Sequence, residues 1–365
     1  MRPILFSVMA ATLFAVVPAH AQKRVDFDAK TIQGDFAVPE APALLMLGVA
    51  TSKLLRPMSV QELTSNLASA SDGFSILPKA FGVEFSPAML RRGARLSIGE
   101  YQQNPMLYRA RLSFAGNRDS AGKRSQLALG LRISLSDKSD LRTNNEVLTA
   151  FDSVTSIRVD SMRAHALALA ANHLPLFGPY TPTQKKLVDS VAKYVADSLH
   201  DALKDRLPRA IAELKRAKES ALWNADVLDV AFGLKASAKD SVAHKSRYDG
   251  AAAWLTKGWR LGDASQFLFG VRNAYERIED DNRMGYNGDV VTRFYMGSNT
   301  AKVSAEAQAT GRDGAKPVWG FRIGGEFETG RSIWIDYAAG WSAKGSLRDG
   351  TLTHTVKFNL APPNK

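Results

Sequence analysis

Cysteine is absent from the 365-residue chain, and no apolar run is long enough for a membrane-spanning helix. An exported protein without cysteine has no disulfide framework, no thiolate metal site and no cysteine nucleophile. The longest apolar run, Ile4 to Val17, has about 14 residues, whereas a spanning helix needs about 20. These absences exclude a helical membrane protein and several classes of enzyme.

Residues 1–21 have the features of a secretory signal peptide. Arg2 precedes the apolar run, and Ala19-His20-Ala21 forms a small-x-small cleavage site before Gln22. Loss of Arg2 takes the 48 basic residues to 47 against 36 acidic ones, a net charge of +11. Because export argues against nucleic acid as a partner, this charge favours outer-membrane lipid and negatively charged lipopolysaccharide.

The last stretch of the chain has the two-residue period of a strand with one apolar face. Leu352, His354, Val356, Phe358 and Leu360 share one face, and threonine, lysine and asparagine side chains occupy the other. The same alternation recurs in segments of about ten residues, which tilted by about 45° span roughly 23 Å, close to the apolar band of a membrane barrel. The strands of a soluble β-sandwich are shorter, nearer five or six residues. Aromatic residues placed for interfacial girdles are Trp259, Trp319, Tyr337 and Trp341.

The sequence therefore predicts an all-β transmembrane antiparallel β-barrel of the bacterial outer membrane, with an α-helical insert between early strands. We count eleven strands from residue 74 onward. A bacterial single-chain barrel has an even number, so we expect about 12, with one overlooked near residues 74–104.

The domain organisation follows from where the alternation stops and starts. After the signal peptide at 1–21, we expect an N-terminal periplasmic arm or lumen plug at 22–73, the first strands at 74–137, a helical insert at 138–224 and the remaining strands at 225–360. Within the arm, the capping box Ser59-Val60-Gln61-Glu62 predicts a short helix through Ala68. The alternation of short and long connections places the insert in the periplasm.

The insert has helical periodicity rather than strand alternation. Helices are predicted over residues 157–172, over residues 182–203, and after Pro208, where Ile211, Leu214 and Leu222 share a face.

Catalytic chemistry has little support in the sequence. His165, His173 and His200 lack metal-site spacing, and no G-x-S-x-G motif accompanies His354. We therefore predict no enzyme, no catalytic residue, no metal and no cofactor.

The polar faces of the strands predict a charged lumen with ten basic and six acidic residues. The principal basic residues are Arg109, Arg111, Arg132, Lys235, Arg272, Arg293, Arg322 and Lys357, joined by Arg260 and Lys302. The acidic residues are Asp229, Glu276, Glu306, Glu326 and Asp336, joined by Glu84. Rings of arginine and lysine select for anions. The alternative is that opposite charges pair across a narrow barrel and close it.

Several short segments resemble an uncharacterised group of predicted outer-membrane proteins. They are Val38-Pro39-Glu40-Ala41-Pro42-Ala43, Leu47-Gly48-Val49, Arg56-Pro57, Glu62-Leu63 and Trp223-Asn224-Ala225. The resemblance implies class and location and brings no activity or site residues. The chain departs from the usual pattern by ending on Ala361-Pro362-Pro363-Asn364-Lys365 rather than on an aromatic residue.

Two functions remain. The first is a narrow channel for passive uptake of small solutes, with anions favoured by the basic lining. The second is a non-conducting scaffold or anchor whose periplasmic helices, residues 139–222, bind a partner protein. A plugged lumen would argue against passive diffusion.

Overall fold

The computed structural model describes residues 29, 32, 40–48, 52–56, 63–70, 80–118, 124–153, 182, 186, 209–239, 246–277, 283–330, 333–345 and 350–360. The chain divides into two compact units. One consists of Met1–Phe27 and Thr149–Leu207, and the other of Asp28–Leu148 and Pro208–Lys365. The second unit holds every strand. The predicted signal peptide and the predicted helices at 157–172 and 182–203 lie outside the described residues, apart from residues 182 and 186.

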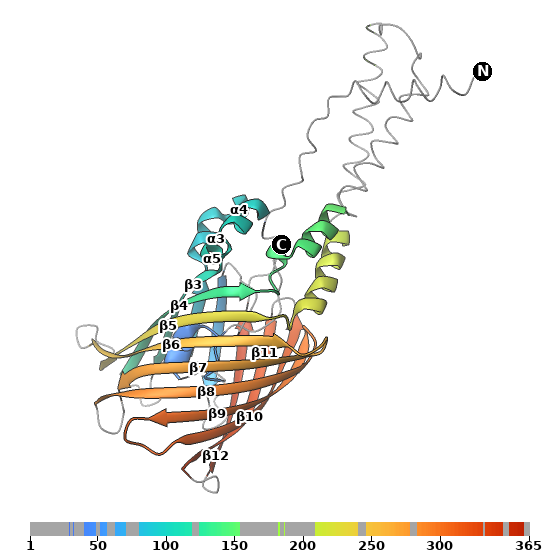
Figure 1. Ribbon diagram of the computed structural model, residues 1–365. Helices are drawn as coiled ribbons and strands as arrows, with labels where there is room; N and C mark the ends of the chain where they lie inside the picture. Colours follow the sequence, from blue (N-terminus) through green and yellow to red (C-terminus); the bar gives the residue numbers. More distant parts are fainter. Residues whose placement is uncertain are drawn as a thin grey trace. The chain divides into compact units, whose positions relative to one another are not determined.

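Twelve antiparallel strands form a closed barrel in which each strand pairs with its neighbours in the sequence (Figure 1). The first six are β1 (Leu63–Ala70), β2 (Ala80–Phe85), β3 (Ala110–Arg118), β4 (Arg124–Asp137), β5 (Val227–Lys239) and β6 (Ser246–Arg260). The last six are β7 (Ser265–Arg277), β8 (Met284–Gly297), β9 (Ala301–Arg312), β10 (Val318–Gly330), β11 (Ile333–Lys344) and β12 (Gly350–Leu360). The pairing of β1 with β12 closes the ring, so every edge has a partner.

The twelfth strand is β1, and the predictions for this segment were wrong in two respects. Leu63–Ala70 is a strand rather than the end of a helix, and it lies before the region 74–104 in which the missing strand was expected. Its small polar side chains give no clear alternation. Leu67 pairs with Phe358 of β12 and with Phe81 of β2, so hydrogen bonding on both sides holds the segment extended.

The two ends of the barrel differ. At the end where β1 begins and β12 ends, here called the terminal end, the large insertions 86–109 and 138–226 come first along the chain, and three turns of two to four residues follow. At the opposite end, here called the loop end, all connections are of five to nine residues. The helical insert therefore emerges at the terminal end, beside the short turns.

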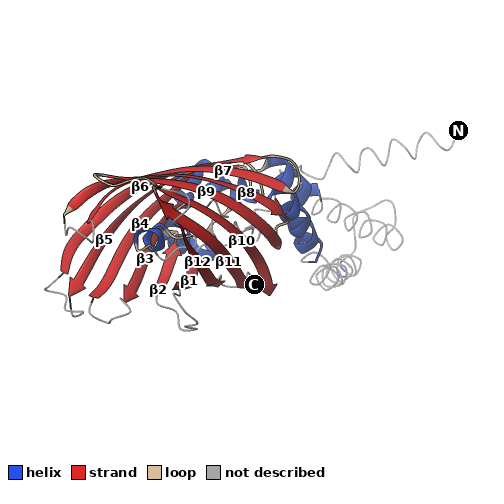
Figure 2. Ribbon diagram, turned by 90° about the horizontal axis from the view of Figure 1, so that it is seen from below, coloured by secondary structure: helices blue, strands red, loops and turns tan. Residues whose placement is uncertain are grey.

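Short helices occupy the insertions and one segment before β1. They are α2 (Pro42–Met46), α3 (Pro87–Arg92), η1 (Gly93–Arg95), α4 (Ile98–Gln103), α5 (Pro105–Arg109) and η2 (Leu141–Thr143). Residues 145–153 and 209–222 are also helical, the latter as the spacing of Ile211, Leu214 and Leu222 predicts. Figure 2 shows helices, in blue, gathered beside one end of the strands. No helix among the described residues is long and apolar enough to cross a membrane.

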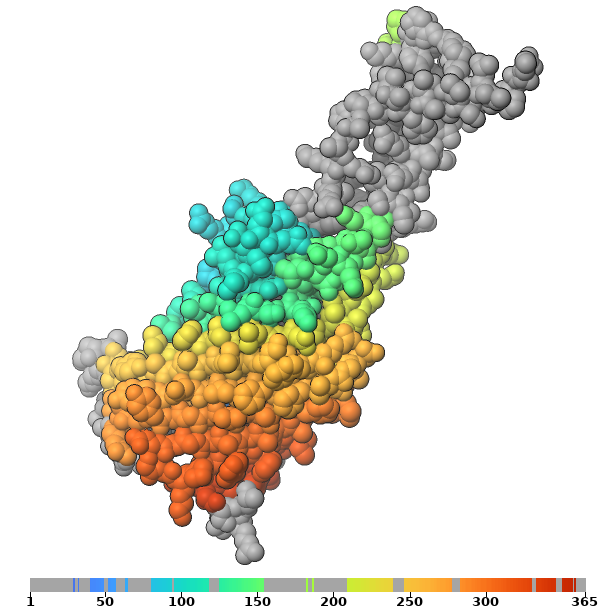
Figure 3. All heavy atoms as spheres, viewed as in Figure 1, coloured from blue at the N-terminus to red at the C-terminus, as the bar shows by residue number. Residues whose placement is uncertain are grey.

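The outer face of the barrel is apolar. Alternate residues along each strand expose large apolar side chains, including Ile323 at 72 % and Leu352 at 76 %. In Figure 3 the strands from β6 to β9, yellow to orange, form the surface of one side of the barrel. Water-soluble monomers do not expose apolar bands of this extent, whereas lipid covers them in an outer-membrane barrel. The predicted outward register is confirmed.

Candidate functional site

Residues 40–48 and 52–56 lie inside the barrel. The backbone amide of Ala43 donates a hydrogen bond to Ser113 Oγ on the inner face of β3, at 3.2 Å. α2 contacts the inner faces of β2, β3, β4 and β5, and all five of its residues are buried. We call residues 40–48 and 52–56 the plug.

Small wall residues make room for α2. A Cβ atom on Gly130 would lie 2.8 Å from Pro42 Cβ and 2.9 Å from the backbone nitrogen of Ala43, so only glycine fits there. A Cβ on Gly82 would lie 2.7 Å from Leu44 Cγ. Trp254 and several alanines occupy other wall positions around the helix, and with α2 they form an apolar core inside the lumen; the alanines are Ala80, Ala115, Ala128, Ala231, Ala252 and Ala274.

The plug rises along α2 and returns over residues 52–56. Met46 lies against Gly233 of β5, and Leu54 lies against Gly270 of β7. Arg56 then reaches the terminal half of β10 and β11. The first and last described residues of the segment, Glu40 and Arg56, therefore lie together in the terminal half of the lumen.

Arg56 anchors the returning limb through buried ion pairs. Its Nη1 donates to Glu326 at 2.6 Å, its Nη2 donates to Asp336 at 2.7 Å, and its Nε lies 3.4 Å from Glu40 at the start of the plug. Its carbonyl oxygen accepts a hydrogen bond from Arg132. An arginine with its donors directed at separate carboxylates is held in one geometry.

A second group of polar contacts adjoins those of Arg56 through the shared carboxylate of Glu326. Ser52 Oγ donates to Glu306 at 2.5 Å, and Glu306 also accepts from Arg293 Nε at 2.8 Å. Arg293 donates to the hydroxyl of Tyr295, which in turn donates to Glu326 at 2.7 Å. Plug and wall therefore share one hydrogen-bonded network.

Burial changes along the lumen. In the terminal half the inward side chains Trp334, Glu326, Asp336 and Arg293 are each at most 2 % exposed. Near the loop end, Arg312 and Thr353 are exposed. Among the described residues, the lumen is therefore open at the loop end and filled in its terminal half, which we call the floor.

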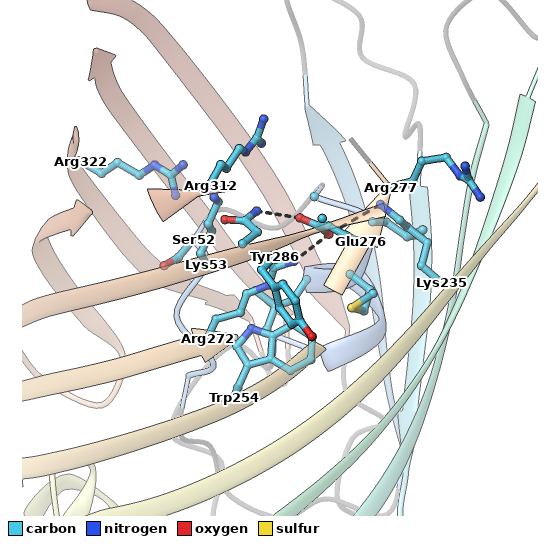
Figure 4. Close-up of a pocket in the computed structure, with 16 residues that line it drawn as sticks. Ser52, Lys53, Lys235, Trp254, Arg272, Glu276, Arg277, Tyr286, Arg312 and Arg322 are labelled. Carbon is cyan, nitrogen blue, oxygen red and sulfur yellow. Dashed lines mark hydrogen bonds and ion pairs between the residues drawn. The ribbon is translucent and has the colours of Figure 1, made fainter. Parts of the chain in front are cut away.

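The lumen contains a cavity of about 320 Å³ between the plug and strands β5 to β10 (Figure 4). Leu45, Met46, Leu47 and Gly48 of the plug border it on one side. Its basic lining residues are Lys53, Lys235, Arg272, Arg277, Arg312 and Arg322, and its one acidic lining residue is Glu276. We call this cavity the basic vestibule.

Ion pairs order the base of the basic vestibule. Lys53 Nζ donates to Asp289 Oδ1 at 2.8 Å, and Arg272 Nη1 donates to Asp289 Oδ2 at 2.8 Å. Arg272 Nη2 also contacts Glu276 at 2.9 Å, and its guanidinium lies 5.7 Å from the ring centre of Trp254. Arg277 also pairs with Asp249, and Arg322 pairs with Glu306, so four carboxylates oppose the six lining cations and the vestibule keeps a net positive charge.

The structure brings most of the predicted lumen residues into ion pairs within the barrel. These pairs are Arg132 with Asp229, Arg272 with Glu276, Arg293 with Glu306, Arg322 with Glu306, Lys235 with Glu276, Lys302 with Glu326, and Arg111 with Glu84; Arg56 joins Glu326 to Asp336. Arg260 instead pairs with Asp263 in an exposed turn. The side chain of Lys357 lies outside the described part. The charged side chains of the floor are therefore paired with one another, as the alternative to a freely charged lining expects. The vestibule keeps an excess of positive charge.

Arg109 was assigned to a strand, and this was wrong. It is the last residue of α5, and its Nε donates to Asp140 at 3.0 Å at the terminal end. Asp140 also accepts from Arg142 Nε and from the Tyr101 hydroxyl. Burial by itself would raise the pKa of Asp140, but Arg142 and Arg109 outweigh it and hold the pKa below its ordinary value. Arg109 therefore fixes a helix to the barrel end.

Four functional residues of the plug were not predicted: Glu40, Ser52, Lys53 and Arg56. The strand periodicity on which the lumen set was chosen does not extend to them. The available signal was the apolar stretch after Pro42, followed closely by the isolated charges of Lys53 and Arg56. Among the described residues, no group of three or more His, Asp or Glu side chains is placed to hold a metal ion.

No protein-family model matches the sequence, and no curated protein matches it at a significant level. Among solved structures, the chain is similar to the KdgM porin, with a TM-score of 0.36 and 6 % identity over 82 % of this chain and 97 % of that one. It is also similar to the NanC porin, with a TM-score of 0.33, 7 % identity and the same coverage. The translocator domain of the autotransporter NalP from Neisseria meningitidis gives a TM-score of 0.31, 8 % identity and coverage of 82 % and 86 %.

At these values the likeness says nothing of what this chain binds. The strand order, the closed ring and the apolar exterior are properties of the chain itself. Its closed ring of antiparallel strands and its apolar exterior make the chain a transmembrane β-barrel of the bacterial outer-membrane type.

Proposed function

We propose that this protein is an outer-membrane channel for small anionic solutes whose lumen is closed at rest by the plug. The observation that carries the proposal is the basic vestibule, where six cations from the plug and the wall surround a cavity that opens toward the loop end. Clefts lined by one sign of charge raise the local concentration of the opposite ion.

The plug makes the channel gated rather than open. Its apolar limb fills the space beside the glycine and alanine wall, and Arg56 ties its return limb to the floor. A solute that enters the vestibule therefore meets α2 and Arg56 before it reaches the terminal end. Passage requires the plug to move.

Planar bilayer recording tests this proposal. We compare the natural chain with a variant in which residues 40–56 are replaced by a glycine-serine segment of equal length. We expect the natural chain to be closed for most of the recording and the variant to carry a steady current, because the variant loses the groups that fill the lumen. A variant current no greater than that of lipid alone would rule out a channel and leave the non-conducting anchor.

Selectivity is measured in the same variant from the reversal potential in a salt gradient. The double variant K235Q/R312Q removes two vestibule charges and should shift the reversal potential in the direction of lower anion selectivity. K316Q removes one charge from an exposed loop at the same end of the barrel, outside the vestibule lining, and should leave it unchanged. Equal effects from the vestibule and loop variants would contradict anion selection in the vestibule.

A further inference from the structure

Lys53 belongs both to the plug and to the lining of the basic vestibule. Its ammonium group contacts Asp289 at 2.8 Å and Thr310 Oγ1 at 3.3 Å, while its side chain remains 34 % exposed toward the cavity. It is therefore the one vestibule cation, among the described residues, that a plug movement would carry away.

Asp289 divides its two oxygens between the plug and the wall. Oδ1 accepts from Lys53 and Thr310, and Oδ2 accepts from Arg272. One carboxylate thus partners two cations, of which Lys53 keeps an exposed side chain while Arg272 already uses both Nη atoms on Asp289 and Glu276. An incoming anion therefore competes with Asp289 for Lys53.

The neighbouring groups define the chemistry of that anion. Arg312 of β9 is exposed and presents a planar guanidinium, which suits carboxylate and phosphate oxygens, and Lys235 adds positive charge from β5. The volume of about 320 Å³ is at the lower limit for ligand pockets, so the occupant is small. The excess of cations favours an occupant with more than one negative charge.

We infer that the basic vestibule binds a small polyanion, a phosphate ester or a di- or tricarboxylate, and that its binding draws Lys53 away from Asp289 and releases the returning limb of the plug. The inference rests on the proposed function and names its solute class and its trigger. A ligand shifts the plug only if it binds the released state more tightly than the docked one, and competition for Lys53 supplies that difference.

Calorimetric titration of the detergent-solubilised full chain tests the site, with inorganic pyrophosphate and citrate as the two probes. We expect saturable binding of both, weakened about tenfold or more by K53M and by K235M, since a charge-assisted hydrogen bond contributes about 1.5–3 kcal/mol. K316M is the matched control and should bind as the natural chain does.

The heat-modifiable migration of the folded barrel on a gel confirms that each variant is folded. K235M does not alter the plug, so it keeps the test valid if K53M disturbs the plug fold. Absence of saturable binding, or equal binding by all four proteins, overturns the site.

Plug release is measured separately through the reactivity of one introduced thiol, because the chain has no cysteine. Ser52 is 2 % exposed, so S52C should react slowly with a maleimide reagent, and saturating pyrophosphate should accelerate the reaction at least several-fold. T351C, at an exposed loop-end position, should react equally fast with and without pyrophosphate. Binding without any change in S52C reactivity overturns the coupling.

The proposed function fails in a different experiment. If pyrophosphate binds and accelerates labelling while the plug-replaced variant carries no current, the site stands and the channel does not. If that variant conducts while neither probe binds, the channel stands and the polyanion site does not.

Discussion

Arg56 is the residue on which the closed state of the lumen depends most. It joins Glu40 of the plug to Glu326 and Asp336 of the floor, and its side chain is 3 % exposed. Its removal would take a buried cationic partner from both floor carboxylates and would leave Glu326 with Lys302 and the Tyr295 hydroxyl. Buried pairs are weak evidence of stability as long as both partners remain, but breaking one is costly.

We therefore predict that R56M lowers the free energy of unfolding by about 3–5 kcal/mol. R322M is the control. Arg322 of β10 also pairs with a buried carboxylate, Glu306, but its side chain is 30 % exposed. We expect its loss to be about 1 kcal/mol or less. Urea titration followed by tryptophan fluorescence measures both values. Equal losses in the two variants would show that Arg56 is not an anchor.

At the scale of single elements, the fit of α2 against the wall depends on Gly130. This position accepts no side chain, since Ser113 Oγ of the wall would clash with a Cβ, and Pro42 Cβ and the Ala43 nitrogen of the plug would lie within 2.9 Å of it. By contrast, the nearest atom to a Cβ on Gly320, in β10, is 3.7 Å away. The two glycines are in equivalent strand environments and differ mainly in what lies opposite them.

G130A should destabilise the barrel by about 1–3 kcal/mol through overpacking, whereas G320A should be neutral or stabilise it by up to about 1 kcal/mol. The difference is read from urea midpoints under identical detergent conditions. If G130A and G320A gave the same midpoint, Pro42 and Ala43 would not lie against β4.

The elements differ in how far the sequence predicted them. Strands such as β4 and β9 alternate nearly without exception, because one face meets lipid and the other meets the lumen, and their registers were predicted correctly. β1 was missed because its side chains are small on both faces and its extended form depends on partners far away in the sequence. The start of β3 was misplaced because Pro105 begins a helix that runs to Arg109.

The site was predicted in part. Alternation identifies which strand residues face inward, and so it found Arg272, Arg293 and Glu306. It does not reveal that a separate segment supplies Ser52, Lys53 and Arg56 to the same lumen, because loop placement leaves no periodic signal. The wall glycines that face the plug, Gly82 and Gly130, appear in the sequence only as positions of the polar face without a side chain.

At the scale of the whole molecule, the barrel is filled in one half of its lumen rather than open throughout. Ion pairs between plug and wall form the floor, whereas the basic vestibule has more cations than carboxylates. Barrels of about eight strands are filled by side chains, and those of 16 or more leave an aqueous channel. At 12 strands the lumen is wide enough to need a plug and narrow enough for one helix and one returning limb to fill it.

The central claim is that the plug occupies the lumen, and disulfide formation in L44C/G82C tests it most directly. Leu44 Cγ lies 2.7 Å from where a Cβ on Gly82 would be, so the two Cβ atoms fall within disulfide range. The matched control is L44C/F81C, since Phe81 is the neighbouring residue and points out of the barrel, 55 % exposed.

Both variants are folded into lipid, oxidised and digested, and the cross-linked peptide is quantified by mass spectrometry. The structure predicts a cross-link in L44C/G82C and none in L44C/F81C. No cross-link in the first variant, or equal amounts in both, would contradict a plug inside the barrel.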